Sequence, residues 1–302
     1  MGILVVGSVA LDTVETPSGK VNDALGGSAV YFSVSASYFT PVDLVAVVGH
    51  DFPERHIKLL NKHGIDTSGL QKVKGKTFRW KGHYMDDLNQ ARTLDTQLNV
   101  FADFSPELPE KHKDNKFVFL ANIDPVLQRK VLGQVKHPNV VACDTMNFWI
   151  ESKRKELIKT LSLVDILVIN EAEVRQLAKE ENLVKATKKI FKFGPKALVV
   201  KRGEYGALFF TPKNVFSVPA YPLEDVVDPT GAGDTFAGGF MGYLAKCGKI
   251  NERNLRRAMI FGSVMASFNV EDFSLNRLST LTKSEIHKRF EQFKKLTHFD
   301  LI

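Results

Sequence analysis

Short runs of apolar residues alternate along the chain with segments whose apolar positions recur every three or four residues. The runs are nearly continuous in Val, Ile, Leu and Phe, which is typical of parallel strands covered on both faces. We expect strands at residues 3–10, 44–48, 117–121, 140–144, 166–170 and 197–201. We expect helices at residues 54–63, 125–136, 152–162, 171–179 and 185–193. This alternation predicts one α/β domain over residues 1–302, with a doubly wound, mostly parallel sheet and ligands at the carboxyl ends of its strands.

Two segments, residues 12–25 and 76–103, interrupt this alternation. In the second, residues 77–84 and 93–101 alternate between apolar and polar positions on either side of a polar turn at residues 86–90, as a β-hairpin does. A loop of 28 residues, the length of the second segment, is uncommon in a compact domain when it has no secondary structure. We therefore predict that the two segments form a small antiparallel β-lid beside the main sheet, rather than two surface loops.

Composition excludes several classes of protein. The 302 residues are 44% hydrophobic and 25% charged, which is enough for a sizeable core. The net charge of +7 favours an anionic ligand such as a nucleotide. The basic residues are dispersed and no aromatic RNA-binding motif is present, so we expect no nucleic-acid partner. Two cysteines cannot build a disulfide framework, and no apolar stretch suits a membrane span, so we expect a cytoplasmic protein.

The strongest chemical signal lies in residues 226–240, where Gly231, Ala232 and Gly233 precede Asp234 at the start of a predicted helix that runs to about residue 246. Backbone N–H groups in such a turn lack intrahelical partners and lie at the positive end of the helix dipole. Because no large side chain intervenes, they can approach a transferring phosphoryl group. Asp234 would accept a proton from a substrate hydroxyl, with a pKa that we expect the helix dipole to lower.

An ordinary turn and N-cap would explain a glycine turn followed by aspartate. Gly238, Gly239 and Gly242 follow inside the helix, however, where each glycine costs about 1 kcal/mol relative to alanine. We expect these glycines to allow close packing against a substrate or a strand. A dinucleotide-binding fingerprint is excluded because Phe236 stands where its third glycine belongs.

Residues 228–234 (DPTGAGD) resemble the C-terminal signature of the ribokinase family, also called the PfkB carbohydrate kinases. The resemblance extends along essentially the whole chain. It includes residues 7–12 (GSVALD), 26–29 (GGSA), 170–173 (NEAE) and 201–206 (KRGEYG), in the family's order. It implies a ribokinase-like fold and an ATP-dependent kinase. The enzyme would use Mg²⁺ to transfer the γ-phosphoryl group to a hydroxyl, expected to be primary, of a small sugar or sugar-like metabolite.

The resemblance also implies roles for individual residues. The base would be Asp234, with the amides of Gly231, Ala232 and Gly233 on the phosphoryl group. Substrate contacts are expected from Asp12, at the end of the first strand, and from Gly26, Gly27 and Tyr31. Nucleotide contacts are expected from Asn170, Glu173, Lys201, Gly203, Gly206 and Thr230. Glu173 would organise Mg²⁺, and Asp228 would lie near a monovalent cation such as K⁺.

Local explanations exist for some of these residues. Asn170 and Glu173 fit a helix N-cap and its first turn, and the glycine pair fits an ordinary turn. We add two hypotheses for the acceptor site: Asn122, at a strand end, and Arg79, in the lid, which would bind a phosphate already carried by the substrate.

Tyr31 departs from the family pattern, because many of its sugar kinases carry a substrate-binding asparagine at the corresponding position. The tyrosine ring could stack on a substrate, bond a hydroxyl, or pack in the core. The alternative acceptor is a nucleoside or a polyol such as inositol, and Tyr31 with Trp80 would favour a base that stacks. A catalytically silent nucleotide-binding regulatory protein is an alternative of another class, which the intact Asp234 disfavours. We also expect that the lid could mediate a homodimer.

Overall fold

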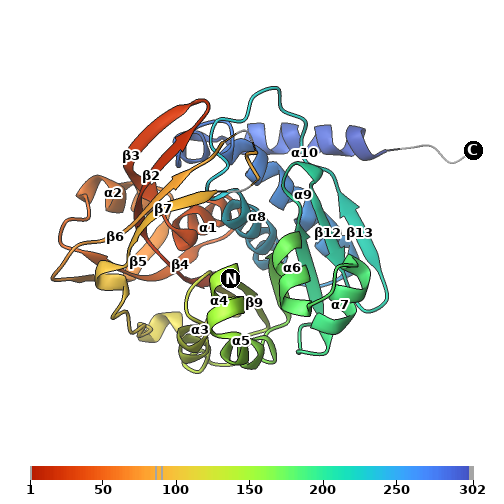
Figure 1. The fold of residues 1–302 in the computed structure, drawn as a ribbon, viewed down its shortest axis with the longest axis horizontal. Helices are drawn as coiled ribbons and strands as arrows, with labels where there is room; N and C mark the ends of the chain where they lie inside the picture. The colour runs from red at the N-terminus through yellow and green to blue at the C-terminus, as the bar shows by residue number, and fades with distance from the viewer. Residues whose placement is uncertain (1, 86, 90, 299–302) are drawn as a thin grey trace, which may run out of the picture.

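Helices cover both faces of a nine-stranded sheet in the computed structural model, which describes residues 2–85, 87–89 and 91–298 (Figure 1). The strand order is β13-β12-β11-β10-β9-β8-β1-β4-β5. From β11 to β5 all neighbouring strands run parallel, whereas β12 and β13 form an antiparallel edge. The predicted doubly wound, mostly parallel sheet is confirmed.

The strands of the main sheet are β1 (Ile3–Val6), β4 (Val42–Gly49), β5 (Ile65–Val73), β8 (Phe117–Leu120), β9 (Val140–Asp144), β10 (Ile166–Asn170), β11 (Ala197–Lys201), β12 (Ala207–Phe210) and β13 (Val215–Val218). The smaller sheet contains β2 (Ala10–Thr16), β3 (Gly19–Gly26), β6 (Phe78–His83) and β7 (Arg92–Gln97). The helices are α1 (Ser28–Ser37), α2 (Glu54–Lys62), α3 (Pro125–Leu132), α4 (Asn147–Ser152), α5 (Arg154–Leu161), α6 (Glu171–Ala178), α7 (Leu183–Phe191), α8 (Ala232–Cys247), α9 (Glu252–Asn269) and α10 (Lys283–Thr297). Short 3-10 helices are η1 (Asn99–Phe101), η2 (Glu110–His112), η3 (Gly203–Tyr205) and η4 (Leu278–Thr280).

The two faces of the main sheet are buried in separate apolar clusters, because successive residues of a strand point to opposite faces. In β1, Ile3 and Val5 belong to the cluster that includes side chains of α1, α8 and α9. Leu4 and Val6 belong to the other cluster, which includes side chains of α3 to α7. The near-continuous apolar strands of the sequence are therefore explained by helices on both sides.

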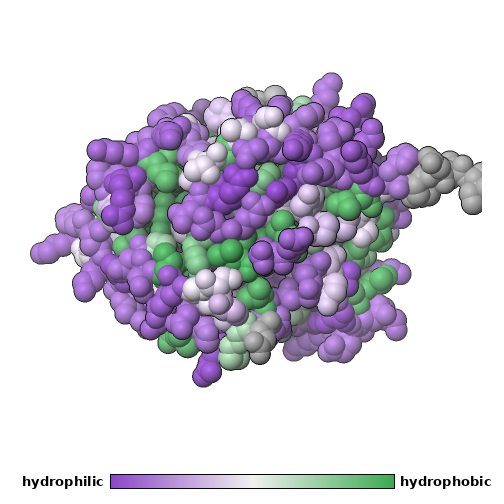
Figure 2. All heavy atoms as spheres, turned by 90° about the horizontal axis from the view of Figure 1, so that it is seen from above, coloured by the Kyte–Doolittle hydropathy of each residue, from purple (hydrophilic) through white to green (hydrophobic). Residues whose placement is uncertain are grey.

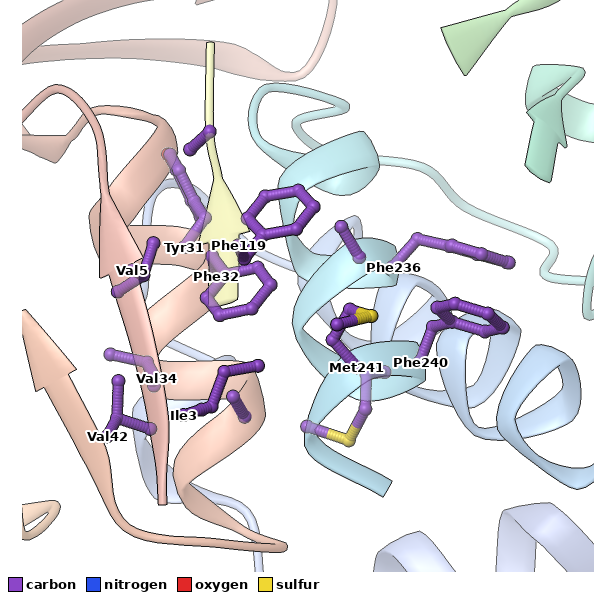
Figure 3. Close-up of a cluster of buried hydrophobic side chains, with 14 of the residues drawn as sticks. Ile3, Val5, Tyr31, Phe32, Val34, Val42, Phe119, Phe236, Phe240 and Met241 are labelled. Carbon is purple, nitrogen blue, oxygen red and sulfur yellow. The ribbon is translucent and has the colours of Figure 1, made fainter. Parts of the chain in front are cut away.

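Aromatic side chains of α1, α8 and the main sheet pack together in one cluster. Figure 3 shows the rings of Phe32, in α1, and Phe119, in β8, which stack with centroids 4.2 Å apart. Phe236, Phe240 and Met241 extend into the same cluster from α8. The helix that carries the glycine turn is thus fixed by a large buried surface.

The glycines inside α8 allow helices to pack against it, and our expectation of a substrate or a strand was wrong. A β carbon at Gly238 would overlap the carbonyl oxygen of Phe32 in α1, and Gly242 meets the same helix. A β carbon at Gly239 would lie 2.8 Å from the carbonyl oxygen of Phe261 in α9. Only glycine lets the backbones of three helices come this close.

The smaller sheet forms the lid and has the strand order β3-β2-β6-β7. Each hairpin, β2–β3 and β6–β7, is antiparallel, but the two hairpins join through β2 and β6, which run parallel. The lid is therefore mixed, and the expectation of an antiparallel lid is corrected. Asp12 lies inside β2, a lid strand, and not at the end of the first strand as predicted. The chain leaves the main sheet at Val6 and enters the lid at Ala10.

Polar side chains cover most of the face seen from above, and apolar ones gather toward its middle (Figure 2). Within the described residues, none of the helices combines the length and the hydrophobicity that crossing a membrane requires.

Candidate active site

The glycine turn precedes α8, and its backbone requires glycine at one position. Gly231 is the N-cap of α8 with φ 74°, in the left-handed region. A β carbon there would overlap the ring of Tyr31, which packs directly against the turn. The Ala232 amide donates to the carbonyl oxygen of Pro229 at 3.1 Å. It is therefore engaged within the turn, contrary to our expectation of a free phosphate donor. The roles of the Gly231 and Gly233 amides stay predictions.

Asp234 lies in the first turn of α8, as predicted, but its pKa is raised to about 7. Loss of solvation around the carboxylate is the main cause, and the negative charge of Asp144 adds to it. The positive charge of Lys201 opposes both. The expected lowering by the helix dipole was wrong, because burial and a like charge outweigh it. A carboxylate that titrates near neutral pH is well matched to act as a general base.

A buried ion pair lies beside Asp234. The Lys201 ammonium, at the end of β11, donates to Asp144 at the end of β9 over 3.1 Å. Burial disfavours its charge, but Asp144, Glu173 and Asp234 outweigh this effect and raise the lysine pKa. A β carbon at Gly233 would lie 2.9 Å from the ammonium nitrogen, so the lysine reaches the glycine turn itself. Sequence reasoning missed Asp144, although an acidic residue that ends an apolar run was a visible signal.

Asn170 and Glu173 form the N-terminal capping box of α6. The Glu173 amide donates to Asn170 Oδ1 at 2.8 Å, and the Asn170 amide donates to Glu173 Oε2 at 3.0 Å. The local explanation by helix capping is therefore confirmed. Burial raises the pKa of Glu173 to about 7, and the charge of Asp144 contributes. Three carboxylates around one ammonium leave an excess of negative oxygen ligands, which fits a hard cation such as Mg²⁺.

A second cluster of potential metal ligands lies at the other end of the main sheet. Among the residues that the structure describes, ligand atoms of Asp43, Asp66 and His112 all lie within 4.8 Å of one another. Lys111 pairs with Asp66, and Asn115 donates to Asp43 at 2.6 Å. Each of the two adjacent carboxylates thus already has a side-chain partner.

Asp12 faces the site from the lid and lacks one hydrogen-bond partner. Its side chain is buried, and within the described part of the chain Oδ1 accepts no hydrogen bond. A β carbon at Gly26 would overlap its carboxylate, and the Gly27 amide donates to it. Burial raises the pKa of Asp12 to about 7, with contributions from Asp228 and Asp234. Buried polar atoms are rarely left unpaired, so this oxygen is available for a ligand hydroxyl.

Tyr31 both packs in the core and borders the site. Only 2% of its surface is exposed, and its ring touches the glycine turn. Burial raises its pKa well above the usual value, and the charges of Asp228 and Asp12 contribute. A second tyrosine, Tyr84, follows β6 in the lid and accepts a hydrogen bond from the hydroxyl of Thr230 at 3.3 Å. Nothing in the sequence around Tyr84 indicates such a contact.

Asp228 holds the segment before the turn in place. Its side chain is 1% exposed, and its two oxygens accept hydrogen bonds from the amides of Thr230, at 2.9 Å, and Ser274, at 3.2 Å. Burial is the main cause that raises its pKa. These bonds explain a structural role, and the proximity to a monovalent cation stays a prediction.

Two predicted acceptor residues lie elsewhere. Arg79 forms ion pairs with Asp23 and, at 3.3 Å, with Asp51, and it lies on the face of β6 opposite to that of Trp80. Arg79 therefore does not join Asp12 in the acceptor site. Asn122 accepts a hydrogen bond from the Trp149 indole at 3.0 Å, next to α4, and its role stays a prediction.

A pocket of about 600 Å³ opens next to the glycine turn. Lys201, Gly203, Gly206 and Gly233 line one part of it, and apolar side chains such as Phe236 line another. Pockets of this size and mixed character bind small ligands and cofactors. The predicted turn after β11 is present, and its two glycines have φ of 57° and 84°. The pocket brings the predicted nucleotide residues Lys201, Gly203 and Gly206 together.

A phosphoryl group placed between the pocket and Asp12 would meet the helix dipole and the Lys201 ammonium, and Asp234 would face the attacking oxygen. This chemistry is that of a phosphotransferase with a hydroxyl acceptor. A sequence model described as pfkB family carbohydrate kinase matches residues 3–281. The cytidine kinase of Thermococcus kodakarensis is 30% identical over 270 residues, which cover 86% of this chain and 96% of that relative. The chain therefore belongs to the pfkB family of carbohydrate kinases.

Solved structures agree on the fold. A nucleoside kinase from Burkholderia thailandensis, in complex with inosine, has a TM-score of 0.76 at 19% identity and covers 96% of this chain and 98% of its own. A fructokinase from Vibrio cholerae, with fructose, ADP and calcium bound, has a TM-score of 0.75 at 17% identity with the same coverage of both chains. At these identities the likeness shows a ribokinase-like fold alone.

Proposed function

We propose that the protein transfers the γ-phosphoryl group of ATP, in the presence of Mg²⁺, to a primary hydroxyl of a ribonucleoside, with cytidine as the first candidate. The relative of highest identity reported above is a cytidine kinase that aligns over nearly its whole length. The fold is shared with a nucleoside kinase that binds inosine. Both the small sugar of our first expectation and the nucleoside carry the hydroxyls that Asp12 would recognise.

The observation that carries the nucleoside proposal is the position of Trp80. It pairs with Asp12 across the parallel strands β2 and β6, so the two side chains lie on the same face of the lid. A β carbon at Gly82 would overlap the indole, which therefore lies flat along its own strand. The indole nitrogen donates to Thr93 at 3.2 Å and is held in place. A flat, partly exposed indole beside a hydroxyl-binding carboxylate suits a sugar joined to an aromatic base.

The reaction follows from the acidic groups and the turn. Asp12 would orient the sugar, and Asp234 would take the proton of the attacking hydroxyl as the bond to phosphorus forms. Lys201 would balance the charge of the transferring group. Mg²⁺, when bound, would neutralise charge on the nucleotide phosphates, and Glu173 is the residue expected to organise it. Because a loose transition state needs proton removal only late, one carboxylate is a sufficient base.

The decisive experiment measures ADP release with cytidine, inosine, ribose, fructose and myo-inositol as acceptors. We expect turnover with cytidine and loss of it in Asp234→Asn, by about 10²–10⁴-fold, while binding of an ATP analogue is retained. Asp114→Asn, the same change at a carboxylate that is 69% exposed, serves as the control. Undiminished turnover in Asp234→Asn would exclude this residue as the base.

A free sugar is the second candidate, because the unpaired oxygen of Asp12 suits any acceptor with hydroxyl groups. The variant Trp80→Ala distinguishes a nucleoside acceptor from a free sugar. Loss of base stacking should raise the KM for cytidine by about 5- to 100-fold and leave the KM for ribose unchanged. Equal changes for both acceptors would contradict the stacking role.

The cytoplasmic location and the homodimer through the lid stay predictions. The lid ends in β7, whose six residues are exposed.

A further inference from the structure

The chain that follows β6 touches both ligand sites. Tyr84 lies at the base of the β6–β7 turn, where its amide donates to the Glu15 carbonyl oxygen in β2 at 2.8 Å. Its side chain is 7% exposed and accepts the hydrogen bond of the Thr230 hydroxyl, one residue before Gly231. A bond between two hydroxyl groups therefore links the lid to the residue that precedes Gly231.

The Tyr84 hydroxyl faces the acidic part of the site. Burial raises its pKa to about 12, and the charges of Asp228, Asp12 and Asp234 contribute. The phenol thus stays protonated, and its own hydrogen remains available to a neighbouring acceptor. A buried phenol near these carboxylates occupies space that water would otherwise fill.

Five residues further along, the tip of the same hairpin reaches the nucleotide pocket. Leu88 and Asn89 line this pocket together with Lys201. The Asn89 amide nitrogen donates to the Glu204 carboxylate at 3.3 Å, and the Glu204 amide donates back to Asn89 Oδ1 at 3.4 Å. A β carbon at Gly203 would overlap that oxygen, so the glycine is what admits the lid residue. The lid therefore supplies part of the pocket wall on the side of η3.

We propose that Tyr84 and Asn89 are positioning residues through which the lid forms a wall shared by the acceptor site and the nucleotide pocket. The inference rests on the proposed kinase function. Asn89 holds the tip against the turn after β11, so nucleotide affinity depends on the lid. Tyr84 holds the base of the hairpin on Thr230 and keeps water from the γ-phosphoryl group. When this bond is lost, water takes the place of the acceptor, and ATP is cleaved to ADP and inorganic phosphate.

The test uses two readouts on the full-length protein. Binding of a non-hydrolysable ATP analogue is measured by calorimetry, and phosphate release from ATP is compared with cytidine phosphorylation. Asn89→Ala should weaken analogue binding about three- to tenfold, the effect of one or two hydrogen bonds. Tyr84→Phe should raise the ratio of hydrolysis to phosphorylation by a similar factor. Leu94→Ala, at an exposed position of the same hairpin, should change neither.

Thr230→Val removes the other hydroxyl and provides an independent check. If the hydrogen bond carries the effect, the double variant with Tyr84→Phe hydrolyses ATP no faster than either single variant. If Tyr84 has a purely structural role, its substitution lowers turnover and leaves the ratio of hydrolysis to phosphorylation unchanged, which would overturn the inference. Unaltered binding of the ATP analogue in Asn89→Ala would overturn it as well. If the wild-type protein phosphorylates no acceptor, the proposed function fails, while analogue affinity and basal hydrolysis still decide the role of the two residues.

Discussion

Replacing Gly231 by alanine tests how the glycine turn before α8 is built. Two costs add at this position. Alanine at φ 74° loses about 1–2 kcal/mol to contact between its β carbon and its own backbone. The β carbon would also overlap the ring of Tyr31, far inside the roughly 3.5 Å at which carbon atoms make favourable contact.

The second cost is large because the ring has nowhere to move. Tyr31 is 2% exposed and belongs to the packed cluster under α8. Inserting a methyl group into such a site typically costs about 1–3 kcal/mol. We therefore expect Gly231→Ala to lower the free energy of unfolding by about 2–5 kcal/mol and to displace the turn, so that turnover falls as well.

Gly64 provides a matched control. Its φ is 69°, nearly that of Gly231, but a β carbon there would meet nothing within 4 Å. Urea denaturation of Gly64→Ala measures the backbone cost alone, and the difference between the two variants measures the contact with Tyr31. We expect this difference to be about 1–3 kcal/mol. If both variants lose the same stability, the ring does not constrain the turn and the reasoning fails.

The remaining predictions concern pH and the buried ion pair. The pKa of Asp234 is raised to about 7, so lowering the pH through that value protonates the base, and turnover should fall about tenfold per pH unit below it. A pH–rate profile that stays flat between about pH 5 and 8 would contradict this. Lys201→Met removes the charge that lowers the pKa of Asp234, so the acid limb of the pH–rate profile should move to higher pH. The KM for ATP should rise as well. Lys196→Met, at an exposed lysine, serves as the control. Asp144→Asn removes a charge that raises the pKa of Asp234, so the acid limb of the pH–rate profile should move to lower pH. Shifts of the same sign in both variants would refute the assignment of this limb to Asp234.

Periodicity was sufficient to predict the main sheet because its strands are apolar on both faces. The expected strands at residues 140–144, 166–170 and 197–201 coincide with β9, β10 and β11. Helix ends were less accurate. The helix expected at residues 152–162 corresponds to α5, whereas α4, which ends at Ser152, was not expected. A helix of six residues is too short to show a clear apolar periodicity.

The site was predicted in part, because its residues come from distant segments. The glycine turn and Asp234 are contiguous, and the sequence displays them together. Asp144 and Tyr84 gain their meaning only from neighbours, Lys201 and Thr230, that lie at least 57 residues away along the chain. The predicted direction of the Asp234 pKa shift was wrong for the same reason, since burial and a carboxylate distant in sequence, Asp144, determine this pKa. The sequence likewise does not reveal which face of a lid strand points inward, so it could not show that Arg79 pairs with Asp23 and Asp51.

The glycines of α8, which admit the backbones of α1 and α9, have a consequence for how this enzyme can change. A residue larger than glycine at those contacts would push whole helices apart, so the half of the site that handles phosphate is resistant to variation. The lid has no such constraint on the pair formed by Trp80 and its cross-strand neighbour Thr96. New acceptor preferences should therefore be sought by randomising these two positions, where diversity alters the shape offered to the substrate and leaves the transfer chemistry intact.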